Sequence, residues 1–201
     1  MLAWSRSGFE DNGRLYNGLR PSRRGSVVSP GRKSPPSVTV CDLGLGEVMS
    51  FENVSVREAH EKQGQGYTYV DVRSIPEFEQ GHPAGAVNVP LLHRDGRSGQ
   101  MMVNREFLDV MRANFPSDAK LLIGCQVGGR SAQAAEALVL AGFNDVANVL
   151  GGFGGARDPM TGALRAEGWT QAALPMETGG ASGRSYEDLH ARLAEEGPVA
   201  E

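Results

Sequence analysis

Cysteine, histidine and aromatic residues are scarce in this 201-residue chain: two Cys, four His and 6% aromatics. Two cysteines exclude a disulfide-stapled scaffold and a cysteine-rich zinc or iron–sulfur site. The histidines, at positions 60, 82, 93 and 190, lack the spacing of a metal-binding motif. We therefore expect neither a metal nor another cofactor.

Long hydrophobic runs are also missing. The longest apolar stretch, at 137–141, is far shorter than the roughly 20 residues that cross a bilayer. Arg6 interrupts the start of the chain too early for the apolar region of a secretory signal. The sequence thus predicts a cytoplasmic protein without membrane contact, whose length fits one domain.

Positive charge is concentrated in the first part of the chain. Residues 1–48 hold seven Arg or Lys and four Asp or Glu, whereas residues 49–201 hold 13 and 20. The first segment is rich in Ser, Arg, Gly and Pro and lacks helical or strand periodicity. It is a disordered basic tail, an untranslated stretch before a start at Met49, or a transit peptide to a plastid or other organelle. Aromatic residues do not interleave its basic ones, so nucleic acid is not an expected partner.

Short strands and helices alternate after position 50, which predicts an α/β domain with a central parallel sheet and helices on both faces. Two capping boxes, at Ser55–Glu58 and Ser74–Glu77, mark helix starts. We expect helices at 55–63, 74–81, 104–115, 131–141 and 185–196, and strands at 67–72, 86–89, 120–123 and 145–150. The proposed division is a tail at 1–48, a domain at 49–178, and a C-terminal helix and tail at 179–201.

The segment after the apolar strand at 120–123 carries the strongest functional signal. In open parallel sheets, sites form beyond the carboxyl ends of strands, and here Cys125 follows the strand after a single glycine, Gly124. A Gly pair, Gly128 and Gly129, lets the backbone turn its N–H groups inward, and a helix begins near Ser131. Such an environment favours a reactive thiolate over an inert buried cysteine.

The loop Cys-Gln-Val-Gly-Gly-Arg at 125–130 resembles the Cys-x-x-Gly-x-Arg loop of rhodanese-like sulfurtransferases. A second block, 71–90, is similar to the family's Asp-Val-Arg, Glu-Phe, Gly-His, Gly-Ala and Asn-x-Pro signature, and the likeness extends to about Met176. The resemblance implies a rhodanese-like three-layer domain. It implies that Cys125 is the catalytic residue, and it places the substrate-binding residues at Gln126, Val127, Gly128, Gly129 and Arg130.

The implied reaction moves a sulfane sulfur through a Cys125 persulfide. Its partners would be a small donor, thiosulfate or a persulfide, and a thiol or cyanide acceptor, with a sulfur-relay protein as a further candidate. Arg130 either braces the loop or meets an anionic donor. Asp71 and Arg73 are expected to form an internal ion pair, and His82 to cap or pack.

Two departures from the family pattern bear on the substrate. Thiosulfate-using members often carry Arg or Lys where this chain has Gln126, which lowers the expected affinity for a dianionic donor. The stretch 154–168 lengthens a family loop and forms either a flap over the site or a surface loop. The alternative functions are a phosphatase or arsenate reductase of related fold and a non-catalytic binding module. The related phosphatases place five residues between Cys and Arg, whereas this chain has four.

Overall fold

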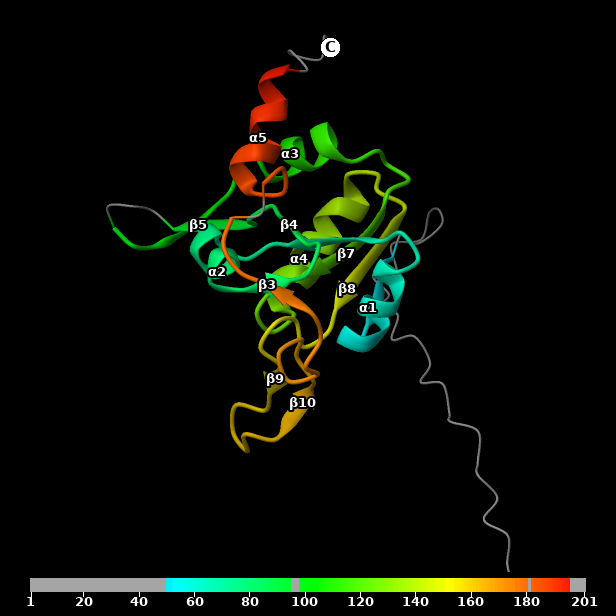
Figure 1. The fold of residues 1–201 in the computed structure, drawn as a ribbon, viewed down its shortest axis with the longest axis vertical. Helices are drawn as coiled ribbons and strands as arrows, with labels where there is room; N and C mark the ends of the chain where they lie inside the picture. The colour runs from blue at the N-terminus through cyan, green and yellow to red at the C-terminus, as the bar shows by residue number, and fades with distance from the viewer. Residues whose placement is uncertain (1–49, 95–97, 181, 196–201) are drawn as a thin grey trace, which may run out of the picture. The chain divides into compact units, whose positions relative to one another are not determined.

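The computed structural model describes residues 50–94, 98–180 and 182–195 (Figure 1). The basic segment 1–48 and the expected last residue of the final helix, at 196, lie outside the described residues. Among the residues that the structure describes, no helix has the length and apolar character needed to cross a membrane.

A five-stranded parallel sheet forms the centre of the described domain. In spatial order its strands are β1 (Glu52–Val54), β8 (Asp145–Val149), β7 (Lys120–Gly124), β2 (Thr68–Asp71) and β4 (Val87–Asn88). β7 is the middle strand and is buried at all but its first residue. Side chains alternate between the two faces of a strand, so Leu121 and Ile123 enter one core and Leu122 the other.

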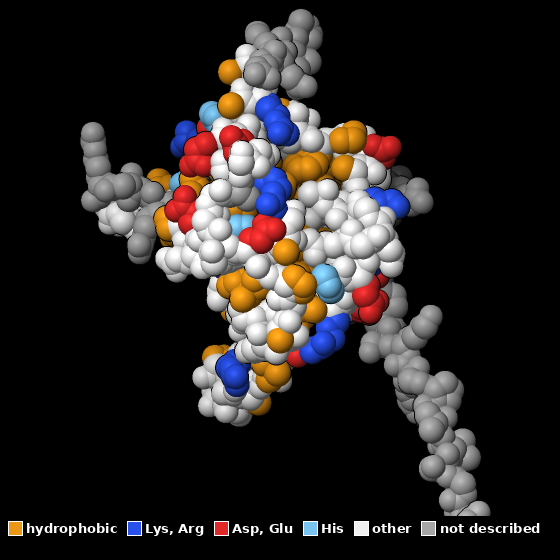
Figure 2. Space-filling view, viewed as in Figure 1, with side chains coloured by type: hydrophobic (Ala, Val, Ile, Leu, Met, Phe, Trp, Pro, Cys, Tyr) orange, Lys and Arg blue, Asp and Glu red, His pale blue; other side chains and the backbone are white. Residues whose placement is uncertain are grey.

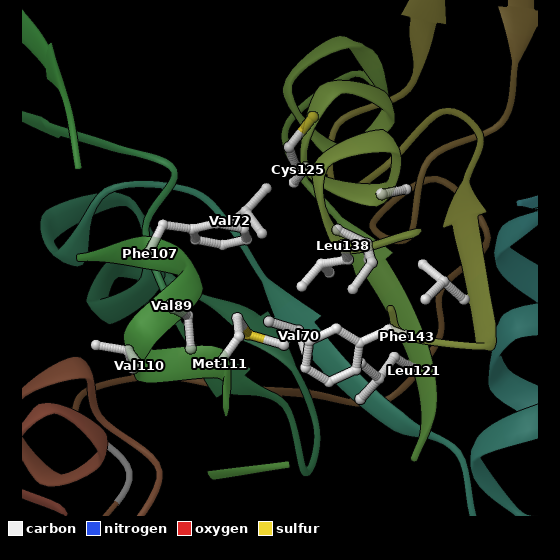
Figure 3. Close-up of a cluster of buried hydrophobic side chains, with 14 of the residues drawn as sticks. Val70, Val72, Val89, Phe107, Val110, Met111, Leu121, Cys125, Leu138 and Phe143 are labelled. Carbon is white, nitrogen blue, oxygen red and sulfur yellow. The ribbon is translucent and has the colours of Figure 1, made fainter. Parts of the chain in front are cut away.

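Helices cover both faces of the sheet, which confirms the three-layer prediction. The first core joins the sheet to residues of α3 (Phe107–Asn114), α4 (Gly129–Leu140) and α5 (Tyr186–Glu195). The second joins it to residues of α1 (Val56–Gln63), α2 (Ile75–Gln80) and the buried Trp169. Figure 3 shows the first core, in which Met111 and Leu138 pack over Val70 and Leu121.

The local signals in the sequence place most helix starts correctly. In the first capping box, the Glu58 carboxylate accepts the Ser55 N–H at 2.8 Å, and the second box is present at the start of α2. α4 begins at Gly129, two residues before the expected start at Ser131. The reason is Gly128, whose left-handed conformation (φ 102°) turns the chain from the loop directly into the helix.

Four features were not predicted: β1 and three two-stranded antiparallel sheets. These sheets pair β3 (His82–Pro83) with β11 (Met176–Glu177), β5 (Leu92–Arg94) with β6 (Met101–Val103), and β9 (Ala156–Arg157) with β10 (Leu164–Ala166). The stretch 154–168 therefore contains a hairpin, which projects away from the sheet in Figure 1.

Gly124, at the end of β7, leaves room for the side chain of Tyr69 from the neighbouring strand β2. A Cβ atom at this position would stand 1.9 Å from the hydroxyl oxygen of the buried Tyr69. We predict that Gly124→Ala lowers the free energy of unfolding by about 1–3 kcal/mol, because the packed core cannot absorb the added methyl group without shifting. Urea unfolding measures the loss. Gly180→Ala, where a methyl group would meet nothing within 4 Å, is the control, and equal stability of the two variants would contradict the prediction.

Candidate active site

Cys125 lies at the carboxyl end of the middle strand, between β7 and α4. The residue is 1% exposed and belongs to the first core. In Figure 3 its sulfur points away from the labelled side chains Val72 and Leu138, toward the start of α4. The side chain is thus anchored in the core while its reactive atom faces the loop.

Two hydrogen-bond donors are directed at the sulfur. The Gly128 N–H donates to Cys125 Sγ at 3.2 Å. The buried Ser131 hydroxyl lies 3.4 Å from the same sulfur and 3.1 Å from the Gly128 carbonyl oxygen, so it can donate to either. Donors at these positions stabilise negative charge on the sulfur.

Ser131 was not among the site residues expected from the sequence. Its place in the chain marks it only as an early residue of a helix, where Ser is common and usually caps the backbone. Its distance from Cys125 in the sequence could have indicated the contact. A residue in the first turn of a helix projects back toward the loop that precedes the helix, and Cys125 lies at the start of that loop.

The turn after β8 holds the Cys125 loop from the other side. The Phe153 N–H donates to the Cys125 carbonyl and the Gly154 N–H to the Gln126 carbonyl, both at 2.8 Å. A Cβ atom at Gly152 would lie 2.2 Å from the Cys125 carbonyl oxygen. Because glycine leaves this space empty, two loops far apart in the sequence meet through their backbones.

Arg130 braces the loop. Its guanidinium donates two hydrogen bonds to the Glu77 carboxylate, at 3.0 and 2.8 Å. The same carboxylate accepts the N–H and the hydroxyl of Ser74 at the start of α2. Glu77 therefore ties the first turn of α4 to the first turn of α2, which is the kind of contact expected of a residue that braces the loop.

Arg73 supports the neighbouring loop residue. As expected, it forms an internal ion pair with Asp71, with side chains 3% and 1% exposed and a closest contact of 2.6 Å. Its guanidinium also donates to Gln126 Oε1 at 3.3 Å and lies 4.1 Å from the centre of the Phe153 ring. Gln126 is thereby held in place by a buried cation, while Val127, at the tip of the loop, is 51% exposed.

Two ring side chains outside the loop, His82 and Trp169, are buried. His82 is fully buried, stacks on the Phe78 ring and donates from Nδ1 to the Phe78 carbonyl at 2.8 Å, which is the expected packing role. Trp169 is fully buried as well and belongs to the second core. Within residues 50–94, 98–180 and 182–195, no three His, Cys, Asp or Glu side chains are grouped so that they could hold a metal ion.

Comparison with known proteins identifies the family. Residues 55–157 match the Rhodanese-like domain family, so the chain belongs to it. These residues contain the strand β7, Cys125 and the whole of α4. The matched part thus includes the entire candidate site described above.

Individual relatives agree with this assignment. "Thiosulfate sulfurtransferase 16, chloroplastic" of Arabidopsis thaliana is 44% identical over 101 residues, which cover 50% of this chain and 82% of that protein. "Rhodanese-like domain-containing protein 15, chloroplastic" of the same plant is 33% identical over 163 residues, covering 78% and 81%. The crystal structure of Rv0390 from M. tuberculosis superposes with a TM-score of 0.52 at 30% identity, covering 63% of this chain and 97% of that one. The fold is thus rhodanese-like, and the family has members named for sulfur transfer from thiosulfate.

Glu77 gives the site a measurable pH dependence. The hydrogen bonds from Arg130, followed by those from Ser74, lower the pKa of Glu77 to about 2, although burial acts in the opposite direction. A carboxyl group with a lowered pKa stabilises the folded state above its unfolded pKa of about 4.3, and that contribution is lost as the pH falls toward the folded value. We predict that Glu77→Gln is less stable than the unchanged protein at pH 7 and that the difference shrinks between about pH 5 and pH 2.

Urea unfolding at several pH values measures this difference. Glu79→Gln, at an exposed position of the same helix, serves as the matched control. A stability gap for Glu77→Gln that stays constant over the whole pH range would show that the charge of Glu77 contributes nothing.

Proposed function

We propose that this protein is a sulfurtransferase that carries a sulfane sulfur as a persulfide on Cys125. The observation that supports this most directly is the position of the sulfur, which follows the middle strand and faces the Gly128 N–H and the Ser131 hydroxyl. The family match and relatives named thiosulfate sulfurtransferase support the same reaction class.

In the first half-reaction, the Cys125 thiolate attacks the outer sulfur of the donor. With thiosulfate, a new S–S bond forms, the donor's own S–S bond breaks, and sulfite leaves with the electron pair. The total charge of −3 is conserved as a persulfide anion and a sulfite dianion. Sulfite needs no proton to depart, so the step requires no general acid.

In the second half-reaction, a thiol or cyanide attacks the outer sulfur of the persulfide and restores the Cys125 thiolate. The enzyme thus alternates between two forms, as in other covalent catalysis. Gln126, Val127, Gly128, Gly129 and Arg130 are proposed to surround the transferred sulfur. Gly129 and Arg130 begin α4, and the first N–H groups of a helix have no partner within the helix, so they can stabilise this anion.

We also propose that the chain divides into a tail at 1–48, a domain at 49–178, and a C-terminal helix and tail at 179–201. In the last part, α5 adds the buried Tyr186 and Leu189 to the first core. The two Arabidopsis relatives are named as chloroplastic, which favours the plastid alternative over the cytoplasm.

Replacement of the nucleophile tests the reaction. We predict that Cys125→Ser remains folded and loses sulfur transfer from thiosulfate to cyanide, because a serine hydroxyl stays protonated near neutral pH and cannot hold a persulfide. Mass spectrometry of the unchanged protein after incubation with thiosulfate should show one added sulfur on Cys125. Cys41→Ser, at the chain's other cysteine, should leave the rate unchanged. Substantial transfer by Cys125→Ser would exclude Cys125 as the carrier.

The length of the loop predicts selectivity for sulfur over phosphate. Four residues separate Cys125 from Arg130, which makes a smaller ring of N–H groups than the five residues of the related phosphatases. Phosphate esters also have poor leaving groups that need a positioned acid. We expect measurable sulfur transfer and negligible hydrolysis of an aryl phosphate. Faster phosphate hydrolysis than sulfur transfer, with both reactions lost in Cys125→Ser, would favour the phosphatase alternative.

A further inference from the structure

Among the residues that the structure describes, Arg130 in the Cys125 loop and Arg73 beside it are each paired with a carboxylate. Arg130 makes two hydrogen bonds to Glu77, and Arg73 makes a buried ion pair with Asp71. The second loop position is Gln126, which is neutral and uses its carbonyl oxygen to accept a hydrogen bond from Arg73. Each of these two positive charges is therefore balanced by a negative one.

The Arg130–Glu77 ion pair is partly buried and is supported by further hydrogen bonds. Its side chains are only 23% and 33% exposed, and Glu77 is further held by the N–H and hydroxyl of Ser74. Glu77 is ionised at neutral pH because its pKa is about 2. The hydrogen bond to Glu77 is the main cause of the raised pKa of Arg130, to which the charges of Glu77, Cys125 and Asp71 also contribute, while burial acts in the opposite direction.

The pairing of these charges determines the net charge that a sulfur donor meets at Cys125. When Cys125 is a thiolate, the loop and its paired arginines carry a net charge of about −1, because the two ion pairs cancel. The exposed side chain at the tip of the loop, Val127, is apolar (51% exposed), and Figure 2 shows that hydrophobic and charged side chains both occur on the face viewed there. A donor with two negative charges is repelled more strongly by such a site than a donor with one.

We propose that Glu77 is a specificity-determining residue, which by neutralising Arg130 makes the site favour sulfane-sulfur donors with a single negative charge over the thiosulfate dianion. Organic persulfide anions and thiosulfonates belong to the favoured class. The inference rests on the proposed function, because it concerns the donor in the first half-reaction.

The step is balanced for a singly charged donor. With methanethiosulfonate, the Cys125 thiolate attacks the outer sulfur, the donor's S–S bond breaks, and methanesulfinate leaves with the electron pair. The charge of −2 before the step equals the charge of the persulfide anion and methanesulfinate after it. Thiosulfate and methanethiosulfonate thus react alike and differ by one charge.

The experiment compares kcat/KM for these two donors, with cyanide as acceptor, in the unchanged protein, Glu77→Gln and Glu79→Gln. Because the enzyme alternates between the free and the persulfide form, kcat/KM for a donor depends only on the first half-reaction. We expect the unchanged protein and Glu79→Gln to prefer methanethiosulfonate. Releasing Arg130 in Glu77→Gln should raise kcat/KM for thiosulfate about tenfold and for methanethiosulfonate about threefold, because the Coulomb energy of a dianion is twice that of a monoanion.

The outcomes separate this inference from the proposed function. Donor preference that is the same in Glu77→Gln and Glu79→Gln, while sulfur transfer persists, would overturn the role of Glu77 alone. Absence of a Cys125 persulfide with both donors would overturn the proposed function.

Salt dependence of the unchanged protein gives a second test that needs no variant. Salt screens charge interactions at exposed sites. Raising the ionic strength should therefore increase kcat/KM for thiosulfate relative to methanethiosulfonate, because it weakens the stronger repulsion. A decrease would show that the donor meets a positive site, which would overturn the inference even if Glu77→Gln did not fold.

Discussion

The buried ion pair between Asp71 and Arg73 connects the segments that surround the reactive cysteine. The Arg73 guanidinium donates to the Gly81 carbonyl beyond α2 and to Gln126 in the loop, and it lies against the Phe153 ring after β8. Breaking such a pair by removing one partner typically costs about 3–5 kcal/mol, because the other charge remains buried without compensation. The ends of three strands are therefore positioned around one pair of charges.

Close backbone packing completes the site. Gly152 lies so near the Cys125 carbonyl that no side chain fits, and hydrogen bonds from Phe153 and Gly154 fasten the two loops together. The result is a short loop whose shape is set by its neighbours and whose Gly128 N–H faces the sulfur. Catalysis by stabilised negative charge depends on donors that are already in place, since donors that must first be ordered lose part of their effect.

Local sequence signals were sufficient for the elements that frame the site. The capping boxes at Ser55 and Ser74 give helix starts because the bonds involved lie within four residues of each other. The apolar run before Cys125 gives the buried strand β7 for a similar reason, since burial on both faces requires apolar residues throughout. β1 and the strands of the small antiparallel sheets were not predicted because strands of two or three residues carry too little pattern. The pairing of β1 with β8 and of β3 with β11 also depends on distant partners.

The sequence by itself determined the class of fold, the position of Cys125 after a buried strand and the glycine turn that leads into α4. The class of fold follows from the alternation of strand and helix patterns along the chain, and the other two follow from residues next to one another. Only the tertiary structure decided that Ser131 reaches the sulfur and that Arg130 is paired with Glu77, 53 residues away. A charged side chain chooses its partner by proximity in space, and proximity depends on how the helices pack on the sheet. The charge that a donor meets at Cys125 is therefore a property of the folded protein.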